Sequence, residues 1–463
     1  MNSNSSILIT PVKPPPDLRL TRIQVEDFRC IESLDIEIPE NVKVICFVGS
    51  NGSSKTALLS MLFDSLCDGT QLQTPDLGQN ESQQNNPYLW KRQKFTGEVR
   101  HGRPAYFLLA TWKMDAQFSQ WLDIVVNSTN PLNVSKHFPQ ISSTVDVPTK
   151  IDLFFRKWYA KPHSDPVSRS VLLYRPADRS ERPSFEELES EEVTISLRTR
   201  TYNQRPFPVR VKTLGLQLEK IIADLLIDQL AGDSSAANIL NSIRLFWQDL
   251  TGQKAVINVN QSPFRRIGFD GLHRFSMLSS GELDILSTAI CIFSQQRYLR
   301  ITSEMTDWPQ AGPSGFVFID EVDAHMHPKW QTEVLPLFLR HFPSITFIIT
   351  THSPFVVQSL PRSTSCVIRL PDGEVFDTDF EAWRIEDISE SVFQTSGNWV
   401  KGFADKLRRL TELCKNPAEA HSALELFNEM KSRNSSPLNS ACDRIAAIHG
   451  SEAFVDLLKE TQK

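Results

Sequence analysis

The fold is decided by residues 42–66, VKVICFVGSNGSSKTALLSMLFDSL. The short and mostly apolar run from Val42 to Val48 predicts a buried strand, which ends at Gly49. The apolar positions of the helix predicted after the loop are Leu58, Leu59, Leu62, Phe63 and Leu66. A strand, a glycine-containing loop and a helix in this order indicate an α/β domain.

Shorter apolar segments on both sides extend this α/β pattern. Residues 23–25 and 34–38 alternate between apolar and polar side chains, which predicts two further strands before the first buried one. Residues 316–319 and 345–349 are apolar runs flanked by helical patterning. Because such runs are typical of buried parallel strands, we expect both to lie inside an α/β sheet.

The composition limits the class of protein. A chain of 463 residues has room for about three domains, or for one large domain with an appendage. Its 40% hydrophobic and 22% charged residues exclude a largely disordered chain, a collagen and a coiled-coil rod. Lysine and arginine number 49 against 55 aspartates and glutamates, and the net charge is −6. Any nucleic-acid contact therefore requires a local basic patch.

The cysteines and the amino terminus bear on the compartment. Seven scattered cysteines without a Cys-x-x-Cys pair favour neither a disulfide framework nor a zinc site, and they fit a reducing environment. The opening residues MNSNSSILIT have no charged region followed by a long apolar run, and no stretch approaches the roughly 18 apolar residues of a membrane span. We therefore expect a cytoplasmic chain without a membrane segment.

The loop after the first buried strand follows the plan of a phosphate-binding loop. Its residues are Gly49, Ser50, Asn51, Gly52, Ser53, Ser54, Lys55 and Thr56. Small residues let backbone N–H groups converge on phosphate oxygens, Lys55 would reach the β and γ phosphates, and the Thr56 hydroxyl would ligate Mg²⁺. Ser54 departs from the pattern, which has glycine there, at a cost of about 1–2 kcal/mol if the backbone needs an unusual conformation.

Two further segments carry polar residues directly after buried strands. Asp320 and Glu321 follow residues 316–319, at the kind of strand end where ligands bind in open α/β sheets. We predict that Asp320 holds Mg²⁺ through its water shell, and that Glu321 orients and deprotonates the attacking water. His352 follows residues 345–349 and could hydrogen-bond a γ-phosphate.

A second anion-binding helix start is predicted upstream of these strands. It consists of Leu278, Ser279, Ser280, Gly281 and Glu282. Small residues at the start of a helix expose backbone N–H groups to an anion. The phosphate loop at residues 49–56 does not itself need this second anion-binding helix start.

Taken in this order, the four segments resemble the nucleotide-binding head of the ABC-type ATPases, over residues 18 to about 370. The phosphate loop matches Walker A, residues 278–282 the signature, residues 316–321 Walker B, and His352 the switch histidine. Residues 323–328, DAHMHP, and the opening Phe28-Arg29 resemble the RecF, SMC and OLD branch, which is AAA_21-like, rather than transporters. Ser280 replaces the first signature glycine, and no glutamine loop can be placed.

The resemblance implies a fold, cofactors and a partner. The fold would be an ABC-type P-loop head, with a mixed sheet that includes antiparallel N-terminal strands, a helical lobe, and a helical C-terminal extension. ATP and Mg²⁺ would be the cofactors. Ser279 and Gly281 of one subunit would cover the ATP bound by Lys55 of another, so that a homodimer or higher oligomer would be required.

The resemblance to ABC-type heads, together with the helical pattern of the C-terminal residues, predicts the domain organisation. We expect a disordered arm at residues 1–17, a head at 18–370 with a helical or insertion lobe at about 113–275, and a helical extension at 385–463. Leu278 lies 222 positions after Thr56, and the residues between them lack sustained heptads, so we expect a compact insertion in place of the long coiled coils of SMC proteins. In the extension, Trp399, Phe403, Leu407, Leu410 and Cys414 would lie on one helix face.

Compact heads with this His-x-His-Pro segment and a helical extension are similar to ATPase subunits of bacterial antiviral systems, such as PtuA of Septu or AriA of PARIS. In those families the ATPase works with a separately encoded effector, such as a nuclease or toxin. The leading interpretation is therefore an ATP-hydrolysing, dimerising switch or sensor in antiviral defence.

Three alternatives belong to other classes. A RecF-like DNA repair or recombination ATPase would use the basic segment Arg198, Arg200, Arg205, Arg210 and Lys212 as a track for nucleic acid. A transporter's nucleotide-binding subunit is disfavoured by the long insertion and the His-x-His-Pro segment. A scaffold with a nearly inactive ATP site remains open because of Ser54.

Two smaller clusters have simpler interpretations. His325 and His327 could be metal ligands, but two histidines without a third ligand more often shape a loop. Asp377 and Asp379 could suggest a nuclease, but they follow a turn and are more simply a solvated strand end.

Overall fold

The computed structural model describes residues 17–68, 98–115, 117–128, 130–160, 169–177, 215–253, 256–260, 266–269, 278–302, 312–394, 401–432 and 436–461. Contacts divide the chain into two units, Met1–Ile388 and Ser389–Lys463, and each is described by itself. The predicted arm lies outside the described residues except for Asp17, and so does the basic segment that contains Arg198 to Lys212.

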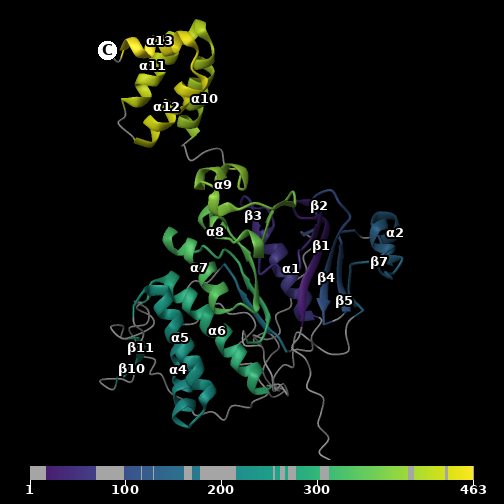
Figure 1. Cartoon of the computed structure of the whole chain (residues 1–463). Helices are drawn as coiled ribbons and strands as arrows, with labels where there is room; N and C mark the ends of the chain where they lie inside the picture. Colours follow the sequence, from purple (N-terminus) through teal and green to yellow (C-terminus); the bar gives the residue numbers. More distant parts are fainter. Residues whose placement is uncertain are drawn as a thin grey trace, which may run out of the picture. The chain divides into compact units, whose positions relative to one another are not determined.

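The first unit contains an antiparallel sheet with the strand order β2-β1-β4-β5-β8 (Figure 1). Its strands are β1 (Leu18–Phe28), β2 (Ile31–Glu37), β4 (Ala105–Met114), β5 (Gln117–Val126) and β8 (Phe154–Tyr159). Burial alternates along β2, as the period-two pattern predicted. The strands at 18–28 and 31–37 pair directly with each other, which confirms the antiparallel N-terminal strands.

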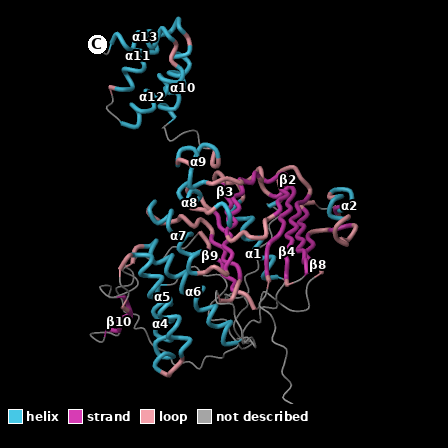
Figure 2. The backbone as a smooth tube through the Cα atoms, in the orientation of Figure 1, coloured by secondary structure: helices cyan, strands magenta, loops and turns pink. Residues whose placement is uncertain are grey.

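A second sheet has the order β15-β14-β3-β13-β12-β9 (Figure 2). Its strands are β3 (Val44–Val48), β9 (Val171–Arg175), β12 (Gly315–Ile319), β13 (Ile345–Thr350), β14 (Ser365–Arg369) and β15 (Glu374–Phe376). The five strands from β14 to β9 run parallel, and β15 is antiparallel. This arrangement brings the carboxyl ends of β3, β13 and β12 to one edge, where ligands bind in such sheets.

The two sheets and helix α1 (Lys55–Asp68) share one hydrophobic core. Trp112 of β4 packs edge-on against Phe316 of β12, with 5.2 Å between the ring centroids. The Trp112 indole N–H donates to Ser65 Oγ of α1 at 3.1 Å, which satisfies a polar group that would otherwise be buried unpaired. The carboxyl-terminal part of α1 is thus anchored to the core that it shares with both sheets.

The helices α4 (Gly215–Leu230), α5 (Ser234–Thr251) and α6 (Ser280–Thr302) pack in sequence, with α5 between the other two. Asp233 caps α5 through hydrogen bonds from Ser235 N and Ala236 N, and Gly252 ends it at φ 72°. Helices α7 (Pro328–His341) and α8 (Pro354–Gln358) follow β12 and β13. The smaller elements are β6 (Leu132–Asn133), α2 (Val134–His137), α3 (Pro139–Ser142), β7 (Lys150–Ile151), β10 (Ile257–Asn260) and β11 (Arg266–Phe269).

The interval at about 113–275, expected as a helical or insertion lobe, has a mixed composition in the structure. Strands β5 and β8 complete the first sheet, and β9 joins the second. Within the described part of this interval, the long helices are α4 and α5. The chain therefore returns to both sheets before it enters the helical part of the lobe.

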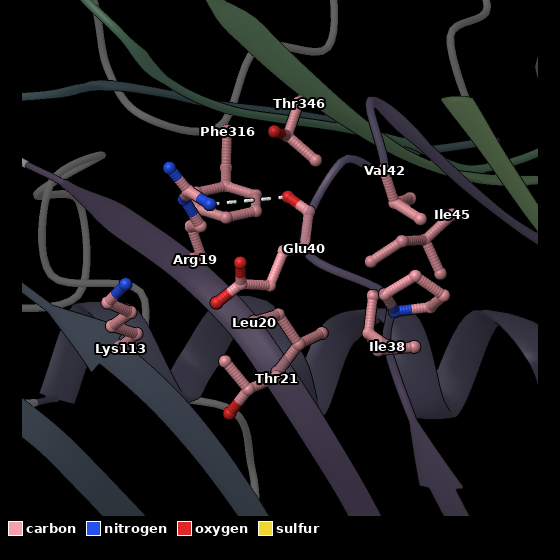
Figure 3. A pocket seen from close by; sticks show the side chains of 11 residues that line it. Arg19, Leu20, Thr21, Ile38, Glu40, Val42, Ile45, Lys113, Phe316 and Thr346 are labelled. Carbon is pink, nitrogen blue, oxygen red and sulfur yellow. Dashed lines mark hydrogen bonds between the residues drawn. The ribbon is translucent and has the colours of Figure 1, made fainter. Parts of the chain in front are cut away.

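A small pocket opens between the two sheets, near the amino ends of the parallel strands (Figure 3). Phe316 and Thr346 line it from the second sheet, and Arg19 and Lys113 from the first. The Arg19 guanidinium donates to the Glu40 carbonyl at 3.4 Å and also pairs with Asp17 at 2.8 Å. The pocket lies at the edge opposite the carboxyl ends of β3, β12 and β13, and its basic groups are engaged by neighbouring oxygens.

The second unit is helical, with α10 (Lys401–Lys415), α11 (Ala420–Lys431), α12 (Ser436–His449) and α13 (Glu452–Thr461) around one core, and α9 (Ile385–Ser391) at the unit boundary. Leu407, Leu410 and Cys414 are buried in that core, as their spacing predicted. Trp399 lies outside the described residues, as does the side chain of Phe403. Among the helices that the structure describes in either unit, none is long and apolar enough to cross a membrane.

Candidate nucleotide site

The loop after β3 has a backbone that requires glycine at its first position. Gly49 has φ 141°, and a Cβ there would lie 2.3 Å from the Leu370 carbonyl oxygen. Gly52 has φ 80°, in the left-handed region that favours glycine. These two residues let the chain turn sharply from the buried end of β3 into α1, which begins directly after the loop at Lys55.

Ser54 stands where the phosphate-loop pattern has glycine, and its φ is 72°. A serine in this conformation costs about 1–2 kcal/mol relative to its preferred backbone regions. The exposed Cys30 lies beside it, with Cys30 Sγ 3.0 Å from Ser54 Oγ and donating to the Gly52 carbonyl at 3.2 Å. Ser54 therefore adopts the backbone conformation that glycine would have there, at a cost in strain, and its hydroxyl contacts the Cys30 thiol.

Lys55 is buried at the start of α1, and its ammonium points into the loop. Nζ donates to the carbonyls of Gly49 at 3.0 Å and Ser50 at 2.9 Å, and to Ser53 Oγ at 3.2 Å. Burial lowers the pKa of Lys55, and the nearby carboxylates of Glu321, Asp320 and Asp323 oppose that shift. Phosphate oxygens would be stronger acceptors than these carbonyls, because their negative charge attracts the ammonium group.

Asp320 joins the phosphate loop to the end of β12. The Thr56 hydroxyl donates to Asp320 Oδ1 at 2.9 Å, although the two residues are 264 positions apart in sequence. The Thr350 hydroxyl of β13 donates to the same oxygen at 2.7 Å. A threonine hydroxyl beside a carboxylate is the type of oxygen ligand pair that Mg²⁺ takes together with waters and phosphates, so these residues fit that ion.

Glu321 follows Asp320 in a left-handed backbone conformation, with φ 48°. Its N–H donates to Thr350 Oγ1 at 2.7 Å, so that Thr350 holds both consecutive acidic residues. The side chain is half-buried. A non-glycine residue at positive φ after a buried strand is uncommon, and such strain concentrates at functional sites.

His352 is half-buried beyond the end of β13, and Asp323 fixes its backbone. Asp323 Oδ1 accepts from His352 N at 3.2 Å and from the Thr351 hydroxyl. Burial, and secondarily the positive charge of Lys55, lower the pKa of His352. The imidazole is therefore mainly neutral near pH 7, and it can donate one hydrogen bond and accept another.

Asp323 and Gln331 are connecting residues that the sequence did not single out. Gln331 donates through Nε2 to the Met326 carbonyl at 2.8 Å, and its Oε1 accepts from the Ser353 hydroxyl. It thereby ties α7 to the residue after His352. In the sequence, Asp323 stands out only as part of the segment DAHMHP, and no local pattern shows that a glutamine within a helix connects that helix to a distant loop.

The signature residues lie at the start of α6. Ser279 N and Oγ donate to Glu282 Oε2 at 2.9 and 2.7 Å, which makes a capping box. Ser279 and Ser280 are exposed, whereas Leu278 is buried. A Cβ on Gly281 would lie 3.0 Å from the His325 carbonyl oxygen, so the residue packs against the loop after β12. Between the described signature and phosphate-loop residues, the structure shows no hydrogen bond.

The minor candidates have structural partners. His327 caps α7 by accepting from Lys329 N at 3.3 Å, and the described residues contain no group of three His, Cys, Asp or Glu that could hold a metal ion. Asp377 pairs with Arg362 at 2.9 Å on the surface. Asp379 accepts from Glu381 N and caps a short helical turn. These contacts are those of loop-shaping residues.

One known protein family matches part of the chain. Residues 152–358 match the family described as "AAA domain, putative AbiEii toxin, Type IV TA system", AAA_21. The match includes the signature, Walker B and switch segments, and it begins after the phosphate loop. It confirms the AAA_21-like resemblance for that part of the chain.

The chain is similar to curated proteins that are named as retron ATPases or as a Septu protein. The chain is 32% identical over 119 residues to "Retron Ec83 probable ATPase" of Escherichia coli, covering 24% of this chain and 21% of the relative. It is 33% identical over 86 residues to "Septu protein PtuA" of Bacillus thuringiensis, covering 17% and 22% respectively. It is 39% identical over 83 residues to "Retron Vc95 probable ATPase" of Vibrio cholerae serotype O1 biovar El Tor, covering 18% and 15%. The chain thus spans less than a quarter of each of these relatives.

Among solved structures, similar chains include the SMC head domain from Thermotoga maritima, with a TM-score of 0.35 and 11% identity, covering 77% of this chain and 97% of that one. RecF with ATP gives a TM-score of 0.37 and 12% identity, with 78% and 99% covered. The predicted α/β head with antiparallel N-terminal strands, a helical lobe and a helical extension is confirmed by the strand order and helices of the chain itself.

Proposed function

We propose that this chain binds ATP with Mg²⁺ and hydrolyses it to ADP and phosphate. The hydrogen bond between Thr56 and Asp320 carries the proposal, because it unites the two segments that would share the metal. Lys55 would bind the β and γ phosphates, and Thr56 and Asp320 would hold Mg²⁺, which neutralises charge developing on the phosphoryl oxygens. Glu321 would position and deprotonate water, and His352 would contact the γ-phosphate.

Catalysis would require two copies of the chain. Ser279 and Ser280 are exposed at a helix start, and within one chain no described contact joins them to the phosphate loop. An exposed helix start suits the phosphates of a second molecule, because the positive end of the helix dipole attracts anions. The complete site would therefore contain residues 49–56 of one subunit and residues 278–282 of its partner.

The names of the relatives, which refer to Septu and retron systems, support a proposal for the biological role. We propose that the chain is a dimerising switch or sensor in antiviral defence, acting on a separate effector such as a nuclease. The DNA repair alternative keeps the same ATP chemistry. DNA-stimulated turnover with affinity that falls steeply with salt would favour that alternative.

The test is ATP binding and turnover as a function of protein concentration. Lys55→Ala should lose ATP binding, measured by titration with a fluorescent ATP analogue, because phosphate charge would lose its buried counterion. Wild-type turnover per subunit should rise with concentration until dimers saturate. Unchanged affinity in the variant would contradict the phosphate-loop assignment, and a flat rate down to monomeric concentrations would contradict the shared site.

A further inference from the structure

Helix α6, which begins with the signature, lies against the outer side of strand β9 (Figure 2). Gln295 joins them as a neighbouring strand would, because its Oε1 accepts from Leu172 N at 3.0 Å and its Nε2 donates to Leu172 O at 2.9 Å. Gln295 is buried. Both ends of one side-chain amide therefore bond to the backbone of a single strand residue.

A buried ion pair makes a second connection near the signature end of the helix. The Arg175 guanidinium, at the end of β9, bonds to Asp284 Oδ1 and lies 3.4 Å from Ser287 Oγ. The side chains of Arg175 and Asp284 are 3% and 10% exposed. Burial also raises the pKa of the nearby Cys291 thiol to about 12. In such surroundings an ion pair resists separation, because each charge would be left without solvent.

The backbone of Arg175 continues this connection to Asp320. Strands β9 and β12 are paired in parallel, with Arg175 opposite Ile319. The Asp320 N–H donates to the Arg175 carbonyl at 2.9 Å. One residue thus holds the signature helix with its side chain and the amide of Asp320 with its main chain.

We propose that Arg175 is a positioning residue that couples the signature helix to Asp320 of the same chain. The inference rests on the proposed function, in which the signature contacts ATP held by the partner. When the signature contacts the ATP of the partner, α6 moves. Because Gln295 and the Arg175–Asp284 pair join α6 to β9, the strand moves with the helix. The position of β9 in turn sets the positions of Asp320 and Glu321. Each nucleotide site of the dimer then responds to occupancy of the other. Arg175 touches no nucleotide in this scheme, so its loss affects turnover rather than ATP affinity.

The experiment uses the full chain and removes both charges, in Arg175→Met/Asp284→Leu, so that no buried charge is left unpaired. The matched control is Arg156→Met/Asp123→Leu, which removes another buried ion pair, at 2.8 Å, between β8 and β5 of the first sheet. The measurements are kcat, the affinity for a fluorescent ATP analogue, and the Hill coefficient for ATP. Thermal midpoints report the effect on stability.

We expect the Arg175→Met/Asp284→Leu variant to lose about tenfold in kcat, within the range of ordinary site-to-site coupling, and to lose any cooperativity of the wild type, with ATP affinity within twofold. The control should retain kcat within twofold at a similar loss of thermal midpoint. Gln295→Leu should reduce kcat in the same direction but less. Equal kcat in the Arg175 variant and the control would overturn the coupling, and so would a loss of ATP affinity parallel to the loss of kcat.

The wild type separates this inference from the proposed function. A wild-type chain that binds ATP without hydrolysing it would contradict the proposed function itself. Wild-type hydrolysis with unchanged kcat in the Arg175 variant would contradict only the coupling. Arg175→Lys provides a second check, since a retained charge should restore part of the lost kcat.

Discussion

The two ends of the proposed site differ in how far one chain completes them. At the edge of the parallel sheet, Asp320 after β12 accepts hydrogen bonds from two hydroxyls, those of Thr56 on α1 and Thr350 on β13. At the start of α6, Ser279 and Glu282 bond mainly to each other, and both serines are exposed. The first region is organised within the chain, whereas the second is exposed, as the proposed contact with a second subunit requires. Variants can separate the two regions.

The largest effect is expected at the organised end. Glu321→Gln should slow turnover at least about 100-fold, because the amide cannot accept the proton of the attacking water. ATP binding should persist, since Lys55 and Thr56 are unchanged. Turnover is measured by phosphate release under saturating ATP, with Glu333→Gln on α7 as a control for the loss of an exposed carboxylate. Near-normal turnover would remove Glu321 from its assigned role.

The second prediction tests whether the two ends come from different subunits. Lys55→Ala and Ser280→Trp should each be inactive alone. The first variant cannot bind the phosphates of ATP, and in the second the indole blocks the signature. Mixed in equal amounts, they should regain at most about a quarter of wild-type turnover, because half of the dimers are mixed and each mixed dimer keeps one intact site of two. The coupling through Arg175 would lower this fraction further, since the opposite site of a mixed dimer holds no ATP.

Phosphate release is measured on the mixture after exchange of subunits. A mixture that stays inactive, while subunit exchange is verified with differently labelled chains, would show that the two ends do not combine between molecules. Restoration above a quarter would indicate that mixed dimers form in preference to dimers of one variant.

A smaller effect is expected from the strained serine of the phosphate loop. Ser54→Gly should raise the free energy of unfolding by about 1 kcal/mol, because glycine adopts a φ of 72° without strain. Loss of the Cys30 contact offsets part of that gain. Chemical denaturation measures the change. Ser50→Gly is the control, and it should destabilise slightly through the entropy of the unfolded chain. Equal destabilisation by both would show that Ser54 carries no strain.

Local patterns were sufficient to predict many elements. The run from Val42 to Val48 formed a buried strand, and the alternation at residues 23–25 and 34–38 gave paired strands. In the helical extension, the spacing of Leu407, Leu410 and Cys414 placed all three side chains in one core. These features depend on neighbours within a few residues, where propensity and capping act directly.

Connections between distant residues could not be predicted in this way. The apolar residues 171–174 are visible in the sequence, but nothing local indicates that they pair with β12. The Arg175–Asp284 pair joins positions 109 apart, and Gln331 acts from within a helix on a loop and a strand end. Which strands become neighbours is decided by packing of the whole sheet, so the coupling residues follow only from the structure.

The smallest expected effect concerns the attachment of the lobe to the signature helix. Arg297 of α6 bonds to Asp228 at 2.8 Å and Asp233 at 2.6 Å. Hydrogen bonds from Ser235, followed by the Arg297 guanidinium, hold the pKa of Asp233 at about 2, below its usual 3.8. Since the folded pKa is lowered, the carboxylate contributes stability above about pH 4, and this contribution is lost as the pH falls from about 4 to 2.

Because the Asp233 side chain is partly exposed, solvent screening limits this contribution to about 1 kcal/mol. Asp233→Asn keeps a capping oxygen and removes the charge, so its thermal midpoint should lie below that of the wild type at pH 6 and converge with it near pH 2. Asp387→Asn, at an exposed position, serves as the control. A constant difference across this pH range would mean that Asp233 stabilises α5 as a cap alone, and that the charge on α6 does not hold the lobe to the signature helix.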